Sequence, residues 1–571
     1  MKRCIGIDLG TSTSEVAVLK DGQPVIIPND KGERVIPSVV FFGEENQVKV
    51  GNDARSYAVL EPENTVIEVK RLMGSGQVVR CRNKRMSPSE VSAHILGYLK
   101  QCAEEFLGEE VDEAVITVPA YFTNEQRVAT REAGELAGFR VERIINEPTA
   151  AALAYGIDHI QEQGIVLVYD LGGGTLDVTV LEIFMGVLDV KASSGNNALG
   201  GKDFDEAVIN RIADRFLKKH GLDLRYDKKA MWRLKEAVEH AKIQLSDAKS
   251  AKIDLPLIAT SEGKSLGLHH NLLRTEFEEV ILEMVKSTFL SVDKALSDAN
   301  LTPADVHTIL LIGGSTRIPL VRRLIAEKFG KEPRFEVNPE EAVALGAAIQ
   351  SGIKRGELPD DRNLIVTDVC PYTLGVEVSR ELGGMSIPGF FDPLIKRNTT
   401  IPVTVKKEYC TVHENQHAVR IRAYQGDAQF VCDNCFIGSF LLENIPQAPA
   451  GAEEIDISFT YDVNGILEVK AVSVSTGNSR DITVDTRKIE PNKAEKVNIE
   501  WKNSRFARKV KSLIRHAEQL LSDTKIDQPK KEEIGYVLYD LKTALSREDE
   551  LSVKRFEDEL TELIYGINEE V

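Results

Sequence analysis

The sequence predicts three successive parts: an α/β part, an antiparallel β domain and a short helical part at the C-terminus. Short apolar runs alternate with helical patterns and glycine-rich turns up to about residue 350, which is typical of an α/β fold. Over about 370–486 the apolar residues recur with a period of two, which indicates strands. After Pro491 the period becomes helical.

In the α/β part, apolar runs predict strands and the amphipathic segments between them predict helices. The predicted strands are 4–9, 114–118, 165–170, 176–183 and 308–312. The predicted helices are 89–107, 124–137, 204–219, 228–246 and 317–329. Thr123 and Gln126 fit a capping box, in which two side chains satisfy the first free amides of a helix.

The two later parts follow a predicted linker. Residues 355–363 (RGELPDDRN) combine a proline with polar side chains, as linkers do. Ile455, Ile457 and Phe459 alternate with other residues, and Asn464-Gly465 is a strong hairpin signal. The helical period then predicts a small bundle with three apolar stripes: Val510, Leu513, Ala517 and Leu520; Ile534, Leu538, Leu541 and Leu545; Val553, Phe556, Leu560, Leu563 and Ile567.

Composition excludes several classes of protein. With 42% hydrophobic residues among 571, the chain as a whole is not disordered. Its 71 basic against 89 acidic residues give a net charge of −18, which argues against nucleic-acid or anionic-membrane binding. Seven thinly spread cysteines do not form a disulfide framework, and no apolar run is long enough for a signal peptide or a membrane span. We therefore expect a cytoplasmic protein.

One internal repeat carries the strongest functional signal. IGIDLGTS (5–12) recurs as VYDLGGGT (168–175), and each copy is a strand ending in Asp8 or Asp170, then a glycine turn and a second strand. Such turns let N–H groups and hydroxyls face phosphate oxygens, and the aspartates can hold Mg²⁺ through water. One copy alone could be a plain hairpin. The repeat is neither a P-loop nor a Rossmann fingerprint, because its turns lead into strands.

Two further features are weak by themselves. Gly313, Gly314, Ser315 and Arg317 form a turn after an apolar strand, where a base or ribose could approach and Arg317 could stack on it. Glu239, Lys242 and Ser246 share one face of a predicted helix, which alone would indicate a solvated surface.

Together these residues resemble the DnaK-type chaperones, the seventy-kilodalton heat-shock family within the actin-like (ribonuclease H-like) ATPase superfamily. The resemblance runs from residue 2 to about 490. It rests on IGIDLGTS (5–12), VKRLMG (69–74), AVITVPAYF (114–122), RIINEPTAAALAYG (143–156), YDLGGGTLDV (169–178), LGGKDFD (199–205), NPEEAVALGAA (338–348) and RNTTIP (397–402). It implies a duplicated α/β ATPase domain (1–357), a linker (358–369), a β-sandwich substrate-binding domain (370–487) and a helical lid (488–571).

The resemblance also implies a role for individual residues. Asp8, Asp170 and Glu147 would hold the water shell of Mg²⁺, Lys70 would position the attacking water or the γ-phosphate, and Asp177 would help to orient the water. The residues expected to cradle the phosphates are Gly10, Thr11, Ser12, Gly172, Gly173, Gly174, Thr175, Gly200 and Gly201. The residues expected around adenosine are Glu239, Lys242, Ser246, Gly313, Gly314, Ser315, Arg317 and Glu340.

The implied activity is an ATP-dependent chaperone cycle, with ATP or ADP, Mg²⁺ and K⁺ as ligands. Extended apolar segments of client proteins would bind the β domain at Val376, Tyr409, Val412, Val419, Ile421 and Ile466, although core packing is an alternative for each residue. The residues implied in interdomain contact and in binding a J-domain partner are Pro119, Arg127, Arg143, Asn146 and Asp368. A small-molecule kinase and a nucleotide-binding holdase are the alternative functions.

Departures from the family pattern resemble a short, specialised bacterial branch that is HscC-like. The segment between Met73 and Ser89 is short, which puts the usual exchange-factor interface in doubt. Asn197 stands near the place where many members have a threonine, and Thr367 replaces an apolar linker residue and should weaken linker docking. Ser379 stands where a bulky residue is expected over the peptide cleft.

Cys432 and Cys435 form a CxxC motif that could be a redox pair or half a zinc site with Cys410, His413 or His417. A turn with incidental cysteines is the favoured interpretation, so the sequence predicts no metal there.

Overall fold

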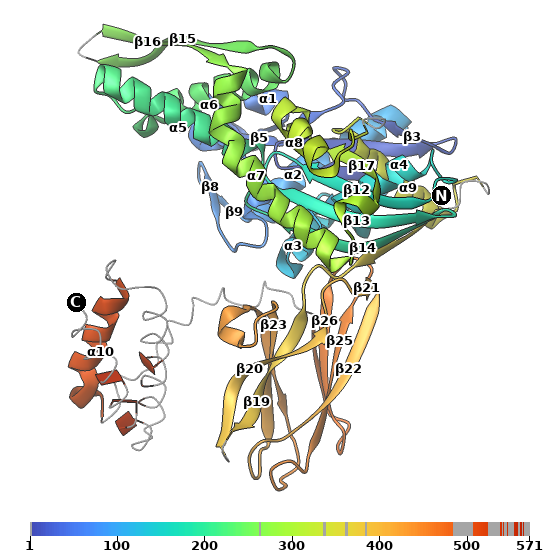
Figure 1. The fold of residues 1–571 in the computed structure, drawn as a ribbon, viewed down its shortest axis with the longest axis vertical. Coiled ribbons are helices and arrows are strands. Elements are labelled where there is room, and N and C mark those ends of the chain that lie inside the picture. The colour runs from blue at the N-terminus through green and yellow to red at the C-terminus, as the bar shows by residue number, and fades with distance from the viewer. Residues whose placement is uncertain are drawn as a thin grey trace. The chain divides into compact units, whose positions relative to one another are not determined.

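The computed structural model describes residues 3–261, 264–334, 338–359, 364–382, 385–483 and 506–522, and scattered positions between 537 and 564. It divides into two compact units, Met1–Thr486 and Arg487–Val571 (Figure 1). The first unit contains the α/β part and the β domain. Linker residues 360–363 and the predicted stripe residues Ile534, Leu563 and Ile567 lie outside the described residues.

Two large sheets form the centre of the α/β part, and they share a topology. The first has the order β11-β10-β1-β2-β3 with β4 beside β2: Arg140–Asn146, Val111–Val118, Arg3–Leu9, Thr13–Lys20, Gln23–Ile26 and Ile36–Pro37. The second has the order β17-β12-β13-β14-β18-β21: Val306–Ile312, Gly164–Leu171, Leu176–Phe184, Val187–Asn196, Ile365–Val369 and Thr400–Ile401. In each sheet the strand with the repeat aspartate starts a run of three antiparallel strands and pairs in parallel with a later strand. The sequence repeat is therefore also a structural repeat.

Helices pack on both sheets. Their bounds are α1 Asn52–Arg55, α2 Pro88–Leu107, α3 Asn124–Leu136, α4 Glu147–Gly156, α5 Gly201–His220, α6 Lys228–Asp247, α7 Arg274–Asp298, α8 Pro319–Phe329 and α9 Ala342–Arg355. The capping box predicted at Thr123 and Gln126 is present at the start of α3. The helix predicted from residue 317 begins at Pro319, after a 3-10 turn over Gly314–Arg317, because proline fits the first turn of a helix.

Smaller sheets complete the α/β part: β5 Val39–Phe42 with β6 Val48–Val50 and β7 Thr65–Ile67, β8 Val79–Cys81 with β9 Lys84–Met86, and β15 Ser250–Ser261 with β16 Lys264–Leu273. In Figure 1 the β15–β16 hairpin lies beside α5 and α6, and their apolar faces share one core with the second large sheet. A separate apolar core lies between the first sheet and α2.

The β domain consists of two four-stranded antiparallel sheets, as the two-residue period predicts. One has the order β20-β19-β23-β24: Met385–Ile395, Leu374–Leu382, Ala418–Gln425 and Cys435–Glu443. The other has the order β22-β25-β26-β27: Val403–Cys410, Glu454–Tyr461, Leu467–Ser473 and Ser479–Thr483. Alternate residues of both sheets form a common core, and Asn464-Gly465 makes the predicted hairpin with Gly465 at φ +69°.

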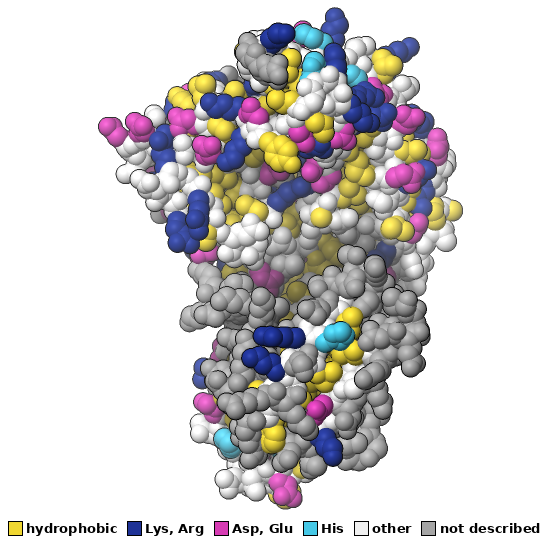
Figure 2. Space-filling model, turned by 90° about the vertical axis from the view of Figure 1, so that its left-hand side faces the viewer, with side chains coloured by type: hydrophobic (Ala, Val, Ile, Leu, Met, Phe, Trp, Pro, Cys, Tyr) yellow, Lys and Arg dark blue, Asp and Glu magenta, His cyan; other side chains and the backbone are white. Residues whose placement is uncertain are grey.

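The C-terminal unit contains α10, Ala507–Ser522. Val510, Ala517, Leu541, Leu545 and Leu560, taken from all three predicted stripes, are buried in one apolar cluster. No described helix is long and apolar enough to cross a bilayer. On the face shown in Figure 2, basic and acidic side chains of the α/β part are interspersed.

Candidate functional site: a nucleotide site joined to a β domain

Three buried acidic side chains, one partly buried aspartate and one buried lysine meet where the two large sheets adjoin. Asp8 lies near the end of β1, and Asp170 and Asp177 are directly opposite each other on β12 and β13. Glu147 is the first residue of α4. The Lys70 ammonium donates a hydrogen bond of 2.5 Å to Glu147, and both residues are buried.

Burial sets the protonation of this centre. It raises the pKa of Asp8 and of Asp177 to about 7, with a further contribution from the negative charge of Glu147. The pKa of Asp170 is raised as well, for the same reasons. Burial alone would lower the pKa of Lys70, but attraction to Glu147 and Asp8 outweighs it. A divalent cation would compensate the surplus of carboxylates, so these residues fit Mg²⁺.

Glycines allow the turns around this centre to pack closely. A Cβ atom on Gly200 would come within 2.5 Å of the Gly174 nitrogen, and one on Gly173 within 2.2 Å of the Ser12 hydroxyl. The amides of Gly201 and Lys202 donate to the carbonyls of Gly172 and Gly173 at 3.0 and 2.8 Å. The structure thus brings together Gly10, Thr11, Ser12, Gly172, Gly173, Gly174, Thr175, Gly200 and Gly201 in adjoining turns.

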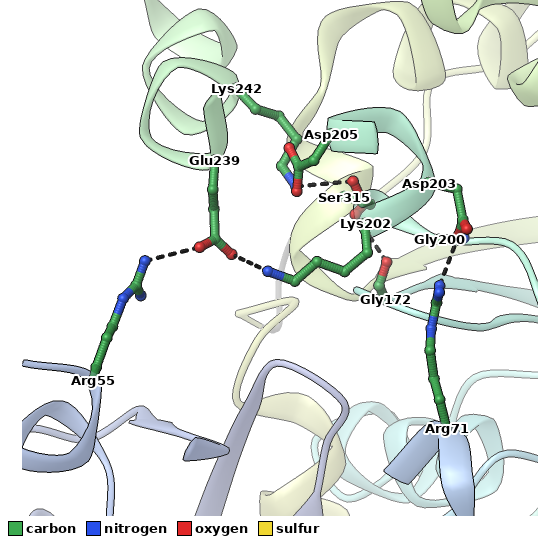
Figure 3. A network of polar contacts seen from close by, with 11 residues as sticks. Arg55, Arg71, Gly172, Gly200, Lys202, Asp203, Asp205, Glu239, Lys242 and Ser315 are labelled. Carbon is green, nitrogen blue, oxygen red and sulfur yellow. Dashed lines mark hydrogen bonds and ion pairs between the residues drawn. The ribbon is translucent and has the colours of Figure 1, made fainter. Parts of the chain in front are cut away.

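The predicted adenosine residues lie next to these turns. Figure 3 shows Glu239 of α6 between Arg55 and Lys202, at 2.8 Å from each, and these cations lower the pKa of Glu239 to about 2 despite its burial. Lys242 binds Asp205 at 2.6 Å, and the Ser315 hydroxyl donates to the Gly172 carbonyl at 2.9 Å. Elsewhere, Arg317 forms a 3.3 Å ion pair with Glu340, while Gly313 and Gly314 begin its turn and Ser246 lies one turn beyond Lys242.

A cavity of about 310 Å³ opens from these turns toward α5 and α6. Thr11, Ser12, Lys202 and Glu239 are among the residues that line it. Arg55, the last residue of α1, lies on the side of the cavity formed by the small sheet that contains β5. Its contact with Glu239 connects this side to α6. The cavity therefore adjoins the first repeat turn at Thr11 and Ser12 and the ion pairs of Glu239 with Arg55 and Lys202.

Sequence reasoning missed part of this network. Arg71 binds Asp203 at 2.8 Å, and Arg55, Lys202 and Asp205 make the contacts given above. Arg71 adjoins Lys70 in the VKRLMG stretch, and Lys202, Asp203 and Asp205 all belong to LGGKDFD. These stretches could have pointed to the residues, whereas no local pattern singles out Arg55.

Glu15 is a further acidic residue that the sequence analysis did not consider. It is 2% exposed, it faces Asp8 across β1 and β2, and its Oε2 has no hydrogen-bond partner in the described part of the chain. Burial, with repulsion from Asp8 and Glu341, raises the pKa of Glu15 from 4.5 to about 10. The folded protein therefore holds a proton at Glu15 that the unfolded chain releases.

Stability should fall as pH rises from about 4.5 to about 10, by up to about 1.4 kcal/mol per pH unit from Glu15. The variant Glu15→Gln keeps a neutral side chain of the same shape, so it should flatten this slope. Its gain in melting temperature over the unmodified protein should be larger near pH 9 than near pH 5, by about several degrees. An equal gain at both pH values, or the same pattern in the exposed control Glu408→Gln, would contradict this account.

The β domain is connected to the cluster of Asp8, Lys70, Glu147, Asp170 and Asp177, here called the nucleotide centre, by side chains of the linker. Asp368 accepts hydrogen bonds from Asn146 at 2.9 Å and from Thr149 at 3.0 Å, both beside Glu147. Arg127 donates to Asn146 at 2.7 Å, and it also reaches the Asn464 carbonyl of the β domain at 3.4 Å.

The two other residues predicted for this interdomain surface lie close by. Pro119 is buried in the turn after β10, next to Ala120, whose carbonyl accepts from Arg127. Burial lowers the pKa of Arg143, against the attraction of Asp368. The structure therefore brings together the predicted set of Pro119, Arg127, Arg143, Asn146 and Asp368.

The linker itself pairs with the second large sheet, as strand β18 parallel to β14. Thr367 was expected to weaken this docking because it is polar. Its hydroxyl donates to Asp189 of β14 at 2.6 Å, and Asp189 also accepts from Lys191 at 2.7 Å. The hydroxyl is thus satisfied, and the structure gives no sign of the weakening that an unpaired polar group would cause.

Thr367→Val should therefore loosen the linker rather than tighten it. The change removes one hydrogen bond to a carboxylate, and we expect a loss of about 1 kcal/mol of docking free energy, or about fivefold more undocked protein. Limited proteolysis of the linker in the presence of ATP measures this population. Thr404→Val on β22, which removes an exposed hydroxyl contact to Thr460, is the matched control. Slower cleavage of Thr367→Val than of the unmodified protein would show that an apolar residue docks better.

The predicted peptide-binding residues occupy different environments. Val376, Ile421 and Ile466 are buried in the β domain, and Val419 is half-buried against its core. The Tyr409 hydroxyl donates to Asp392 at 2.7 Å, whereas Val412 is 39% exposed. Core packing accounts for Val376 and Ile421, whereas Ile466 is buried outside that core. A peptide-binding role for the six residues stays a prediction.

The CxxC motif lies at the end of a 3-10 turn, Val431–Asp433, that leads into β24, and both cysteines are exposed. No group of three His, Cys, Asp or Glu side chains in the described ranges is arranged to hold a metal ion directly. The structure therefore gives no support to a zinc site with Cys410, His413 and His417.

Comparison with known proteins agrees with this architecture. The family model described as Hsp70 protein matches residues 4–571. Similar curated proteins are the chaperone protein DnaK of Thermosipho africanus (strain TCF52B), 44% identical over 97% of this chain and 94% of the relative, and that of Thermosipho melanesiensis, 43% identical over 97% and 95%. The chaperone protein DnaK of Thermotoga neapolitana is also 43% identical over 97% and 95%. The resemblance inferred from the motifs is confirmed, and the chain belongs to the Hsp70 family of ATP-hydrolysing molecular chaperones.

Proposed function

We propose that this chain hydrolyses ATP at the centre around Lys70 and Glu147 and uses the hydrolysis to control how its β domain holds extended apolar segments of client proteins. The observation that carries the proposal is the linker contact. Asp368 binds Asn146, the residue immediately before Glu147, so one strand end joins the β domain to the nucleotide centre. A nucleotide-dependent shift of Glu147 would therefore alter the contact between Asn146 and Asp368 of the linker, as coupling between two sites requires.

At the nucleotide centre we assign the roles that the family resemblance implies. Lys70, held by Glu147, would place the attacking water or the γ-phosphate, and Asp177 would orient the water. Asp8, Asp170 and Glu147 would hold Mg²⁺ through its water shell, and the bound ion would neutralise charge on the phosphates. Burial of Lys70, Glu147, Asp170 and Asp177 supports the assignment, because electrostatic interactions are stronger where water is excluded. K⁺ rests on the resemblance alone.

Around this centre, the domain layout inferred from the sequence belongs to the proposal: an actin-like ATPase domain, a linker, a β-sandwich for substrate and a helical lid. A J-domain co-chaperone is proposed to bind near Arg143 and Asn146. No exchange factor is included, because the segment between Met73 and Ser89 is short. The proposed compartment is the cytoplasm, which the sparse, scattered cysteines support.

The test is single-turnover ATP hydrolysis with and without a saturating extended apolar peptide. If the proposal holds, peptide accelerates hydrolysis severalfold, because capture by the β domain releases the linker contacts. A rate that ignores every peptide tested, with ATP still bound and hydrolysed, would contradict the coupling and favour a nucleotide-binding module. Hydrolysis accompanied by phosphate transfer to a small molecule would instead favour a kinase.

A further inference from the structure

Tyr372 of the β domain reaches the ATPase domain close to the nucleotide centre. It follows the linker strand β18, and its hydroxyl donates a hydrogen bond to the backbone carbonyl of Tyr121, in the turn between β10 and α3. The two rings meet edge to face, with centroids 4.8 Å apart and planes at 62°. Burial raises the pKa of Tyr372, so its hydroxyl keeps the proton that it donates.

Tyr121 in turn holds Asp177. The amide of Tyr121 donates to the Asp177 carboxylate at 3.2 Å, so the two backbone groups of one residue face the β domain and the nucleotide centre. Gly195 packs against both residues. A Cβ atom there would lie 3.1 Å from the Asp177 Oδ1 and 3.4 Å from the Tyr121 Cβ. The hydrogen bond therefore links the position of the Asp177 carboxylate to that of Tyr121, with Gly195 packed beside both.

The other carbonyls of this turn are held from within the ATPase domain. Arg127 donates to Ala120 at 2.9 Å and to Phe122 at 3.3 Å. The Tyr121 carbonyl has two donors, the Asn197 side chain at 2.6 Å and the Tyr372 hydroxyl. Only the second of these depends on docking of the β domain. The Asn197 side chain would keep its hydrogen bond to Tyr121 when the β domain leaves.

We propose that Tyr372 is a positioning residue for ATP hydrolysis, which restrains Asp177 through Tyr121 while the β domain is docked and releases it when the domain moves away. The proposal rests on the proposed function, because it takes Asp177 to be at the catalytic centre and peptide to free the β domain. In the proposed function peptide accelerates hydrolysis, so the restraint on Asp177 that peptide removes must slow hydrolysis while the β domain is docked. Removing the hydroxyl should then mimic the peptide.

The experiment compares Tyr372→Phe, which keeps the ring and loses the hydroxyl, with the unmodified full-length protein. Single-turnover hydrolysis is measured with and without a saturating extended apolar peptide, and ATP affinity is measured separately with a fluorescent nucleotide. We expect the rate without peptide to rise roughly two- to tenfold, as loss of one hydrogen bond allows. The rate with peptide and the ATP affinity should stay the same.

The matched control is Tyr424→Phe, which removes a hydroxyl contact to Glu377 within the β domain. The proposal is overturned if Tyr372→Phe leaves the rate without peptide unchanged or lowers it, if ATP affinity changes in proportion to the rate, or if Tyr424→Phe has the same effect. Failure of the proposed function is a separate result, since it would show as an unmodified protein that ignores peptide. Tyr372→Leu, which also removes the ring, should raise the rate at least as much.

Discussion

Replacing Lys70 with alanine should reduce single-turnover ATP hydrolysis by a factor of roughly 10² to 10³ and leave ATP binding nearly unchanged. The ammonium is buried and lies 2.5 Å from Glu147, so it is positioned before the nucleotide arrives. Preorganised charge of this kind acts mainly in the transition state. Nucleotide affinity, by contrast, should come mostly from the glycine turns and from the clamp around Glu239.

The control for Lys70→Ala is Lys228→Ala, because the Lys228 side chain is 73% exposed. Lys70→Ala also leaves Glu147 buried without its cation, and a loss of stability of about 3–5 kcal/mol can follow. Melting curves with bound ATP separate this loss from the catalytic effect. Turnover equal to that of the unmodified protein, in a variant that binds ATP, would refute the assignment of Lys70.

Gly346→Ala should destabilise the α/β part more than any surface change. Gly346 lies in α9 where this helix crosses α4, and a Cβ atom there would fall 1.7 Å from the Ala150 carbonyl oxygen. Because the obstacle is backbone, the helices must separate, and we expect a loss of about 3 kcal/mol, the upper end of the usual cost of overpacking. Glu147 begins α4, so hydrolysis should fall as well.

A matched glycine is available in α2. Gly97 has no atom within 4 Å of its missing Cβ, so Gly97→Ala should be neutral or stabilising by about 1 kcal/mol. Thermal unfolding of both variants measures the difference. Similar melting temperatures for Gly346→Ala and Gly97→Ala would show that the crossing of α4 and α9 can relax.

Local patterns predicted the parts of this molecule that depend on neighbouring residues. The turns after Asp8 and Asp170, the capping box at Thr123 and the hairpin at Asn464-Gly465 each occupy a few adjacent positions, and the structure contains all of them. Lys70 and Glu147, which come from different motifs, could be brought together only through the family resemblance.

Contacts between residues far apart in the chain have no such local pattern in the sequence. Arg55 binds Glu239 and Tyr372 binds Tyr121, and each contact joins segments that are far apart in the chain. The residues next to these four in the sequence form no pattern that indicates the contacts. Thr367 illustrates the same limit. Its polar side chain looked unfavourable in the sequence, since nothing there indicates that Asp189 lies opposite.

The pairing of the linker with β14 has a consequence for the protein's own solubility. When β18 leaves the sheet, the segment Val187–Asp189 becomes an exposed edge whose amides and carbonyls can pair with any extended chain. The chaperone would then expose an unpaired strand edge, which is a feature that promotes aggregation of its own clients. The charges of Asp189 and Lys191 on that strand disfavour pairing with a foreign strand that offers no partner for them, whereas Thr367 of β18 offers one to Asp189.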